Sequence, residues 1–128
     1  MSTSLQTDIM LAMMKDIVVK CDIFSSLPDA VVVAVVRQLK MEIYLPGDKM
    51  CREGDIGEEM YFLVSGECQV TTVKTGDKIL ATLESGAVFG EVAILQHQRR
   101  NATITASSNS DVRLLKKKDF RKVAIKVT

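Results

Sequence analysis

Residues 41–90 read MEIYLPGDKMCREGDIGEEMYFLVSGECQVTTVKTGDKILATLESGAVFG, and all seven glycines of the chain lie in this stretch. Five of them are nine or ten residues apart, namely Gly47, Gly57, Gly66, Gly76 and Gly86. Glycines at this spacing are typical of turns between short strands. The stretch therefore predicts a mainly β fold, an antiparallel β-barrel or jelly roll rather than a parallel sheet.

The segments between the glycines alternate apolar and polar residues or carry β-branched and aromatic side chains, as strands do. Together with two segments further along the chain, the predicted strands are residues 41–45, 60–64, 68–73, 78–83, 102–106 and 111–115. Residues 91–95 interrupt this pattern with an apolar run that favours a short helix. A helix that begins there would have unpaired N–H groups in its first turn, which favour an anion.

Helices are predicted on both sides of the β region. The first spans residues 8–20, and its expected buried face is apolar at helical spacing: Ile9, Met10, Met13, Ile17 and Val18. The second spans residues 30–39, with Ser26 as its N-cap, Pro28 in its first turn and Asp29 at its positive end. The last spans residues 118–128, with an apolar face of Phe120, Val123, Ala124 and Val127.

Composition limits the classes of function. A chain of 128 residues with 47% hydrophobic content fits one domain with one packed core. The net charge of +1 argues against a broad surface for nucleic acid or lipid, so any bound anion should be small and locally held. The longest apolar run, residues 30–36, is far shorter than the roughly 20 residues that span a bilayer, so no direct membrane insertion is expected.

Neither a metal site nor a catalytic centre is expected. The three cysteines are widely spaced and form no CxxC motif, which argues against a disulfide framework or zinc knuckle and favours a reducing cytosol. His97 is the only histidine, so a His-rich metal site cannot form. Because there is also no evident nucleophile–base pair, the chain is not expected to be an enzyme.

Residues 89–103, FGEVAILQHQRRNAT, supply the groups needed to hold a small phosphorylated nucleotide. Gly90 permits a close backbone approach, and the planar guanidinium of Arg100 can grip a phosphate through two hydrogen bonds. Glu91 can accept a hydrogen bond from a ribose hydroxyl. Because an arginine–phosphate contact contributes about 1.5–3 kcal/mol and micromolar affinity needs about 8 kcal/mol, other contacts must contribute most of the binding.

The order Phe-Gly-Glu-Val-Ala-Ile-Leu, followed after five residues by Asn-Ala-Thr, resembles the phosphate-binding cassette of the cyclic nucleotide-binding domain family. The resemblance continues back through residues 46–48, 52–57 and 60–63 to cover roughly residues 21–125. It implies an eight-stranded jelly roll, or double-stranded β-helix, flanked by helices and containing a short phosphate-binding helix. Residues 1–20 would be a helical linker segment and residues 21–128 the cyclic nucleotide-binding domain.

The resemblance also implies roles for individual residues. Arg100 would pair with the cyclic phosphate, Glu91 would bind the ribose 2′-hydroxyl, and backbone amides of Gly90, Ala93 and Asn101 or Ala102 would complete the cage. The purine would be lined by Val70, Ala81, Leu83 and Val88. The full implied ligand-binding set is Gly90, Glu91, Val92, Ala93, Arg100, Asn101, Ala102, Val70, Ala81, Leu83, Val88 and Phe89.

Two departures from the family pattern affect these expectations. Many cGMP-preferring members have threonine directly after the phosphate arginine, where this chain has Asn101. Because an amide can both donate and accept, the choice between cAMP and cGMP stays open. The family's final lid helix would lie beyond Thr128, so this fragment is expected to hold its ligand weakly and not to complete a full switch.

The closest resemblance within the family is to cyclic-nucleotide-gated and hyperpolarisation-activated channels, through Ile23-Phe24, residues 44–48 and the segment 8–20. It implies a cytosolic sensor that binds cAMP or cGMP, needs no other cofactor and regulates the gating of a cation channel. The implied partners are the nucleotide and the rest of the channel, its linker and pore, in a tetrameric membrane protein whose cytoplasmic side carries this domain. The alternatives are the sensory domain of a transcription regulator and a protein kinase regulatory subunit, with a jelly-roll enzyme least favoured.

Overall fold

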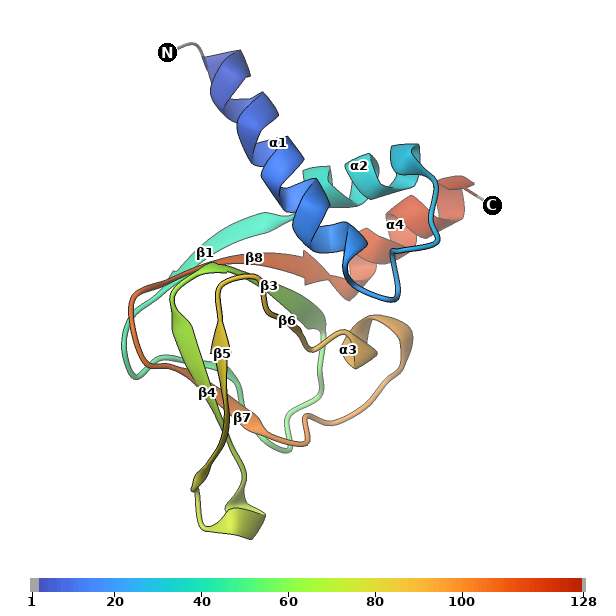
Figure 1. Ribbon diagram of the computed structural model, residues 1–128. Coiled ribbons are helices and arrows are strands. Elements are labelled where there is room, and N and C mark those ends of the chain that lie inside the picture. Colours follow the sequence, from blue (N-terminus) through green and yellow to red (C-terminus); the bar gives the residue numbers. More distant parts are fainter. Residues whose placement is uncertain (1–2, 128) are drawn as a thin grey trace.

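The computed structural model describes residues 3–127, and it describes side-chain surroundings for residues 9–123. In Figure 1 the strands form a roll, while α1, α2 and α4 lie together on one side of it. The elements in chain order are α1 (Thr3–Val19), α2 (Asp29–Gln38), β1 (Lys40–Tyr44), β2 (Lys49–Cys51), β3 (Glu59–Ser65), β4 (Glu67–Thr71), the 3₁₀ turn η1 (Val73–Thr75), β5 (Ile79–Glu84), β6 (Val88–Phe89), α3 (Val92–Leu95), β7 (Thr103–Ala106), β8 (Ser110–Lys116) and α4 (Lys117–Val127).

The strands of the described residues form two four-stranded sheets, ordered β1-β8-β3-β6 and β2-β7-β4-β5. All of their pairings are antiparallel, and the chain passes repeatedly from one sheet to the other. The predicted antiparallel jelly roll with flanking helices is therefore confirmed. The six predicted strands correspond to β1, β3, β4, β5, β7 and β8. The prediction missed β2 and β6, because strands of three and two residues are too short to show alternation.

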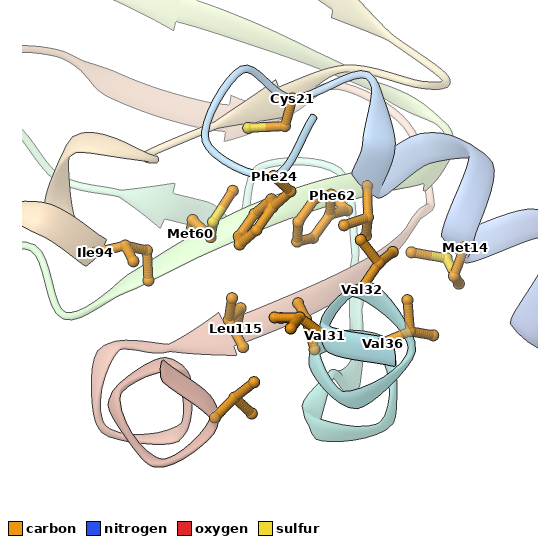
Figure 2. Packing of buried hydrophobic residues seen from close by; sticks show 13 residues of the cluster. Met14, Cys21, Phe24, Val31, Val32, Val36, Met60, Phe62, Ile94 and Leu115 are labelled. Carbon is orange, nitrogen blue, oxygen red and sulfur yellow. The ribbon is translucent and has the colours of Figure 1, made fainter. Parts of the chain in front are cut away.

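Buried side chains gather in two clusters, one on each side of the sheet that contains β3. Met60 and Phe62 point toward the helices, whereas Tyr61 and Leu63 point into the roll, as the two-residue period of a strand requires. Figure 2 shows the helix-side cluster, where Phe62 faces Phe24 and the valines of α2. Both faces of β3 are thus buried, which makes this strand the centre of the packing.

The start of α2 differs from the prediction. Pro28 rather than Ser26 is the N-cap, and no side chain caps the helix. The Pro28 carbonyl accepts hydrogen bonds from the amides of Val31 and Val32, so the first turn forms without a hydroxyl cap. Asp29 does lie in the first turn, where its carboxylate pairs with Lys15 of α1.

The expected buried face of α1 is partly wrong. Val18 is buried as predicted, but Ile9, Met10 and Met13 are exposed, and Met14 is buried instead. The reason is that α1 packs mainly through its C-terminal half, while its other end projects away from the roll (Figure 1). In α4, Val123 is buried as predicted and Phe120 packs edge-on against Phe24; Ala124 and Val127 lie outside the residues whose side chains are described.

Candidate functional site

The helix α3 interrupts the β pattern between β6 and β7, at the position predicted. Gly90 makes the turn into it with φ +78°, a conformation that L side chains rarely adopt. A Cβ atom at this position would lie 2.8 Å from Nη1 of Arg100 and 3.2 Å from the carbonyl oxygen of Glu59. Gly90 is therefore required both by the turn and by the close approach of Arg100.

A cavity of about 330 Å³ opens beside α3, within the size range of small-molecule sites. Its walls consist of Cys51, Val70, Val88, Phe89, Gly90, Glu91, Val92, Ala93, Gln98, Arg99, Arg100, Asn101, Ala102 and Ile104. All the predicted ligand-binding residues except Ala81 and Leu83 are in this set. The structure thus brings residues from β4, β6, α3 and the loop before β7 around one space.

Ala81 and Leu83 lie on β5, opposite Val70 and Cys68 of β4. Ala81 is exposed, and Leu83 packs against the interior of the roll, so neither lines the cavity.

Four lining residues were missed from the sequence: Cys51, Gln98, Arg99 and Ile104. Gln98 and Arg99 belong to the quoted run 89–103, and Ile104 begins the alternation of β7, so the sequence carried a signal for these three. Cys51 ends β2, a strand of three residues that is too short to show alternation in the sequence.

The backbone of Arg100 is fixed by the loop between β2 and β3. Its amide donates to the Asp55 carbonyl (2.7 Å), and its carbonyl accepts from the Gly54 amide (2.8 Å). The Gly57 amide donates to the Gln98 carbonyl (3.0 Å), which adds a third tie. The position of Arg100 therefore depends on a segment more than forty residues earlier in the chain.

The guanidinium of Arg100 is half-buried beside the cavity. Its Nη2 donates to the Glu59 carbonyl (2.6 Å), and its Nη1 lies 3.4 Å from the Gly90 carbonyl. A guanidinium has five N–H donors, so two such bonds leave donor capacity for an anion. Glu91, on the same cavity, is the N-cap residue of α3 and its side chain makes no capping bond.

One backbone amide assigned to the phosphate cage makes a hydrogen bond within the protein. The resemblance placed the Ala93 amide in the phosphate cage, but this amide donates to the Gly90 carbonyl (3.1 Å). The neighbouring Ile94 amide donates to the Glu91 carbonyl (3.1 Å) in the same manner. Some of the N–H groups in the first turn of α3 are thus already hydrogen-bonded to backbone carbonyls.

A second cavity, also of about 330 Å³, adjoins the first. It is lined by Lys20, Cys21, Asp22, Ile23, Gly86, Val88 and Glu91. Val88 and Glu91 line both cavities, so they separate the candidate site from the connection between α1 and α2. Burial is the main cause of a raised pKa of the Cys21 thiol, and the charge of Glu91 adds to the rise, consistent with their proximity.

Two structural findings limit other kinds of site. Among the residues that the structure describes, no three His, Cys, Asp or Glu side chains gather as metal ligands would. In the same part of the chain, no helix combines the length and the apolar character that crossing a membrane requires.

The two tyrosines of the chain are expected to ionise only at high pH. Burial raises the pKa of Tyr44 to about 12 and raises the pKa of Tyr61 further. Unfolded tyrosine ionises near pH 10, so above that pH the folded state binds more protons than the unfolded state and stability falls as pH rises. We expect a spectrophotometric titration of the folded protein to show no tyrosinate below about pH 11. If either tyrosine ionised with a midpoint near pH 10 in the folded protein, the burial of that ring would be contradicted.

The sequence profile of the cyclic nucleotide-binding domain family matches residues 41–126. The chain is 35% identical to human cyclic nucleotide-gated channel beta-3, in an alignment that covers 95% of this chain and 16% of the channel. It is 33% identical to a cyclic nucleotide-gated channel of Caenorhabditis elegans, over 91% of this chain and 16% of that protein. The chain therefore spans less than a fifth of the length of these relatives.

The chain is also similar to a protein kinase regulatory subunit in sequence and to a solved structure in fold. The cAMP-dependent protein kinase regulatory subunit of Debaryomyces hansenii is 44% identical over 66% of this chain. A solved structure, that of a cyclic nucleotide-binding-like protein from Brucella abortus, superposes with a TM-score of 0.81 at 18% identity, covering 88% of this chain and 97% of that one. At this level of identity the solved structure supports the fold alone.

Proposed function

Because the chain belongs to the cyclic nucleotide-binding domain family, we propose that the cavity beside α3 binds cAMP or cGMP. The observation that carries this proposal is the placement of Arg100 and Glu91 on the wall of one cavity, with Gly90 packed directly against the guanidinium of Arg100. A guanidinium suits a phosphate, and a carboxylate suits a pair of ribose hydroxyls.

In the proposed complex Arg100 binds the cyclic phosphate and Glu91 accepts a hydrogen bond from the ribose 2′-hydroxyl. The backbone of Asn101 and Ala102 lies beside the phosphate, and Val70 and Val88 form an apolar wall for the purine. Asn101 is exposed and can donate or accept, so both bases are compatible with its side chain.

We further propose that the domain regulates the gating of a cation channel. The human and Caenorhabditis elegans channel relatives align with 95% and 91% of this chain, which includes most of the helical segment before the roll, whereas the alignment with the kinase relative covers 66%. Val88 and Glu91 line both cavities, so a ligand that moves them would also affect the segment that connects α1 and α2. In this proposal residues 1–20 are a linker to the pore of a tetrameric channel, and the domain lies on the cytoplasmic side.

A sensor domain of a kinase regulatory subunit is the second candidate, since that relative has the higher identity over the region it covers. Both candidates share the nucleotide site. They differ in what the helices act on.

The nucleotide site is tested by titrating the 128-residue chain with cAMP and cGMP, using calorimetry and heteronuclear NMR. We expect saturable shifts at Gly90, Glu91 and Arg100 with at least one ligand. The 2′-deoxy form of that ligand should bind about tenfold weaker, because it lacks the hydroxyl assigned to Glu91. Absence of shifts at these residues with millimolar cAMP and cGMP would refute the proposal.

Replacing Gly57 with alanine is expected to weaken nucleotide binding by about tenfold. Its backbone φ is not in the left-handed region, so space alone is limiting: a Cβ atom would lie 2.7 Å from Cβ of Ala93 and 2.9 Å from Cζ of Arg100. Both neighbours belong to the proposed site and would have to move.

The matched control is Gly76→Ala. Gly76 has φ +68° and open space around its Cα, so this change strains the backbone at a distance from the site. It should lower the denaturation midpoint and leave the dissociation constant unchanged. Equal dissociation constants for Gly57→Ala and the wild-type chain would show that Gly57 does not shape the site.

A further inference from the structure

One aromatic ring, that of Tyr61, contacts two residues of the run 89–103, Phe89 and Arg100. The Tyr61 ring on β3 stacks on that of Phe89, with centroids 5.0 Å apart and planes inclined by 15°. The same ring has Cζ of Arg100 5.7 Å from its centroid. Phe89 and Arg100 thus both contact one side chain of β3, which lies far from them in the sequence.

The Tyr61 ring is itself held rigidly. Its side chain is 2% exposed, and its strand pairs with β6 on one side and β8 on the other. Its hydroxyl lies 2.9 Å from both the carbonyl oxygen of Met50 and Oε1 of Glu59. The backbone of Glu59 also accepts the bond from Nη2 of Arg100, so one short segment of β3 contacts both ring and guanidinium.

We propose that Tyr61 is a positioning residue for Arg100: its ring face holds the guanidinium in the orientation in which the free N–H groups face the cavity. The carbonyl groups of Glu59 and Gly90 tether the guanidinium nitrogens, and the electron-rich ring face attracts the cation as a whole. A long side chain fixed in this way loses less conformational entropy when it binds an anion. This inference rests on the proposed function, in which Arg100 binds the cyclic phosphate.

The first test varies the electron density of the ring face and keeps its shape nearly constant. It compares Tyr61→Phe with variants that carry difluorophenylalanine or trifluorophenylalanine at position 61. Fluorine withdraws electron density from the ring face, which weakens attraction of a cation but keeps the packing. We expect Tyr61→Phe to bind cyclic nucleotide within about threefold of the wild-type chain, and the trifluoro ring to bind about three- to tenfold weaker than Tyr61→Phe. In the Arg100→Ala background the fluorines should have no effect. Constant affinity across the series would overturn the inference.

The second test needs no ligand. In the nucleotide-free protein, the Nε–H signal of Arg100 should be sharp and protected from exchange in the wild-type chain and in Tyr61→Phe, and broadened in the trifluoro variant. Tyr44→Leu is the matched control, because Tyr44 packs on the same interior cluster, and it should leave this signal unchanged. If neither cyclic nucleotide binds, the proposed function fails while this measurement still decides the role of Tyr61. An Arg100 signal unaffected by fluorination would refute that role.

Discussion

Replacing Arg100 with alanine is expected to weaken cyclic nucleotide binding by about tenfold to a hundredfold. The physical reason is the loss of a charge-assisted contact, which contributes about 1.5–3 kcal/mol, where 1.4 kcal/mol corresponds to a factor of ten. The affinity of Arg100→Lys should fall between those of the wild-type chain and Arg100→Ala, since lysine keeps the positive charge but lacks the planar guanidinium. Calorimetry on the 128-residue chain measures the dissociation constants directly.

The control for this prediction is Arg121→Ala, which removes the same charge from an exposed position on α4. It should leave affinity unchanged within about twofold, because exposed charges distant from a site are screened by salt. Circular dichroism and a denaturation curve establish that each variant is folded. If folded Arg100→Ala binds as tightly as Arg121→Ala, the phosphate does not contact Arg100.

Replacing Phe62 with alanine is expected to cost about 3–5 kcal/mol of unfolding free energy. Phe62 is fully buried between the roll and the helices, with its ring centroid 6.5 Å from that of Phe24 (Figure 2). A domain of this size is stabilised by roughly 5–15 kcal/mol in total, so the loss is a large share of the whole. The truncation also removes a contact between β3 and the helices, and we expect those helices to become less protected from hydrogen exchange.

Chemical denaturation compares this variant with Leu45→Ala, which removes an exposed side chain and should change stability by no more than about 0.5 kcal/mol. Phe62→Leu should lose an intermediate amount of unfolding free energy, because leucine keeps part of the side-chain volume. Similar costs for Phe62→Ala and Leu45→Ala would mean that the helix-side cluster contributes little to stability.

Patterns that act over a few residues were sufficient to predict the fold class. Glycine spacing located the turns, alternation located the six longer strands, and an apolar run located α3, because each of these depends on local backbone and side-chain periodicity. Asp29 in the first turn of α2 follows from the same kind of local reasoning. The run 89–103 likewise marked most of the residues that the structure places on the cavity wall.

Family resemblance supplied what periodicity could not. Val70, Ala81 and Leu83 read as ordinary core residues from their pattern, and only the resemblance made them candidates for the site. The resemblance assigned Val70, Ala81 and Leu83 to the purine, and of these only Val70 lines the cavity beside α3, because strand pairing and cavity shape depend on the whole roll.

The sequence by itself determined the jelly roll, the position of its helical insert and the identity of the charged groups offered to a ligand. Only the tertiary structure decided which face of α1 is buried, why no side chain fits at Gly57, and how Arg100 is held by Glu59, Gly90 and Tyr61. Most of those facts depend on contacts between segments about forty or more residues apart along the chain, such as the contact between Glu59 and Arg100. Short-range periodicity records which side of a strand or helix a residue occupies, and it carries no information on which distant segment comes to lie against that side.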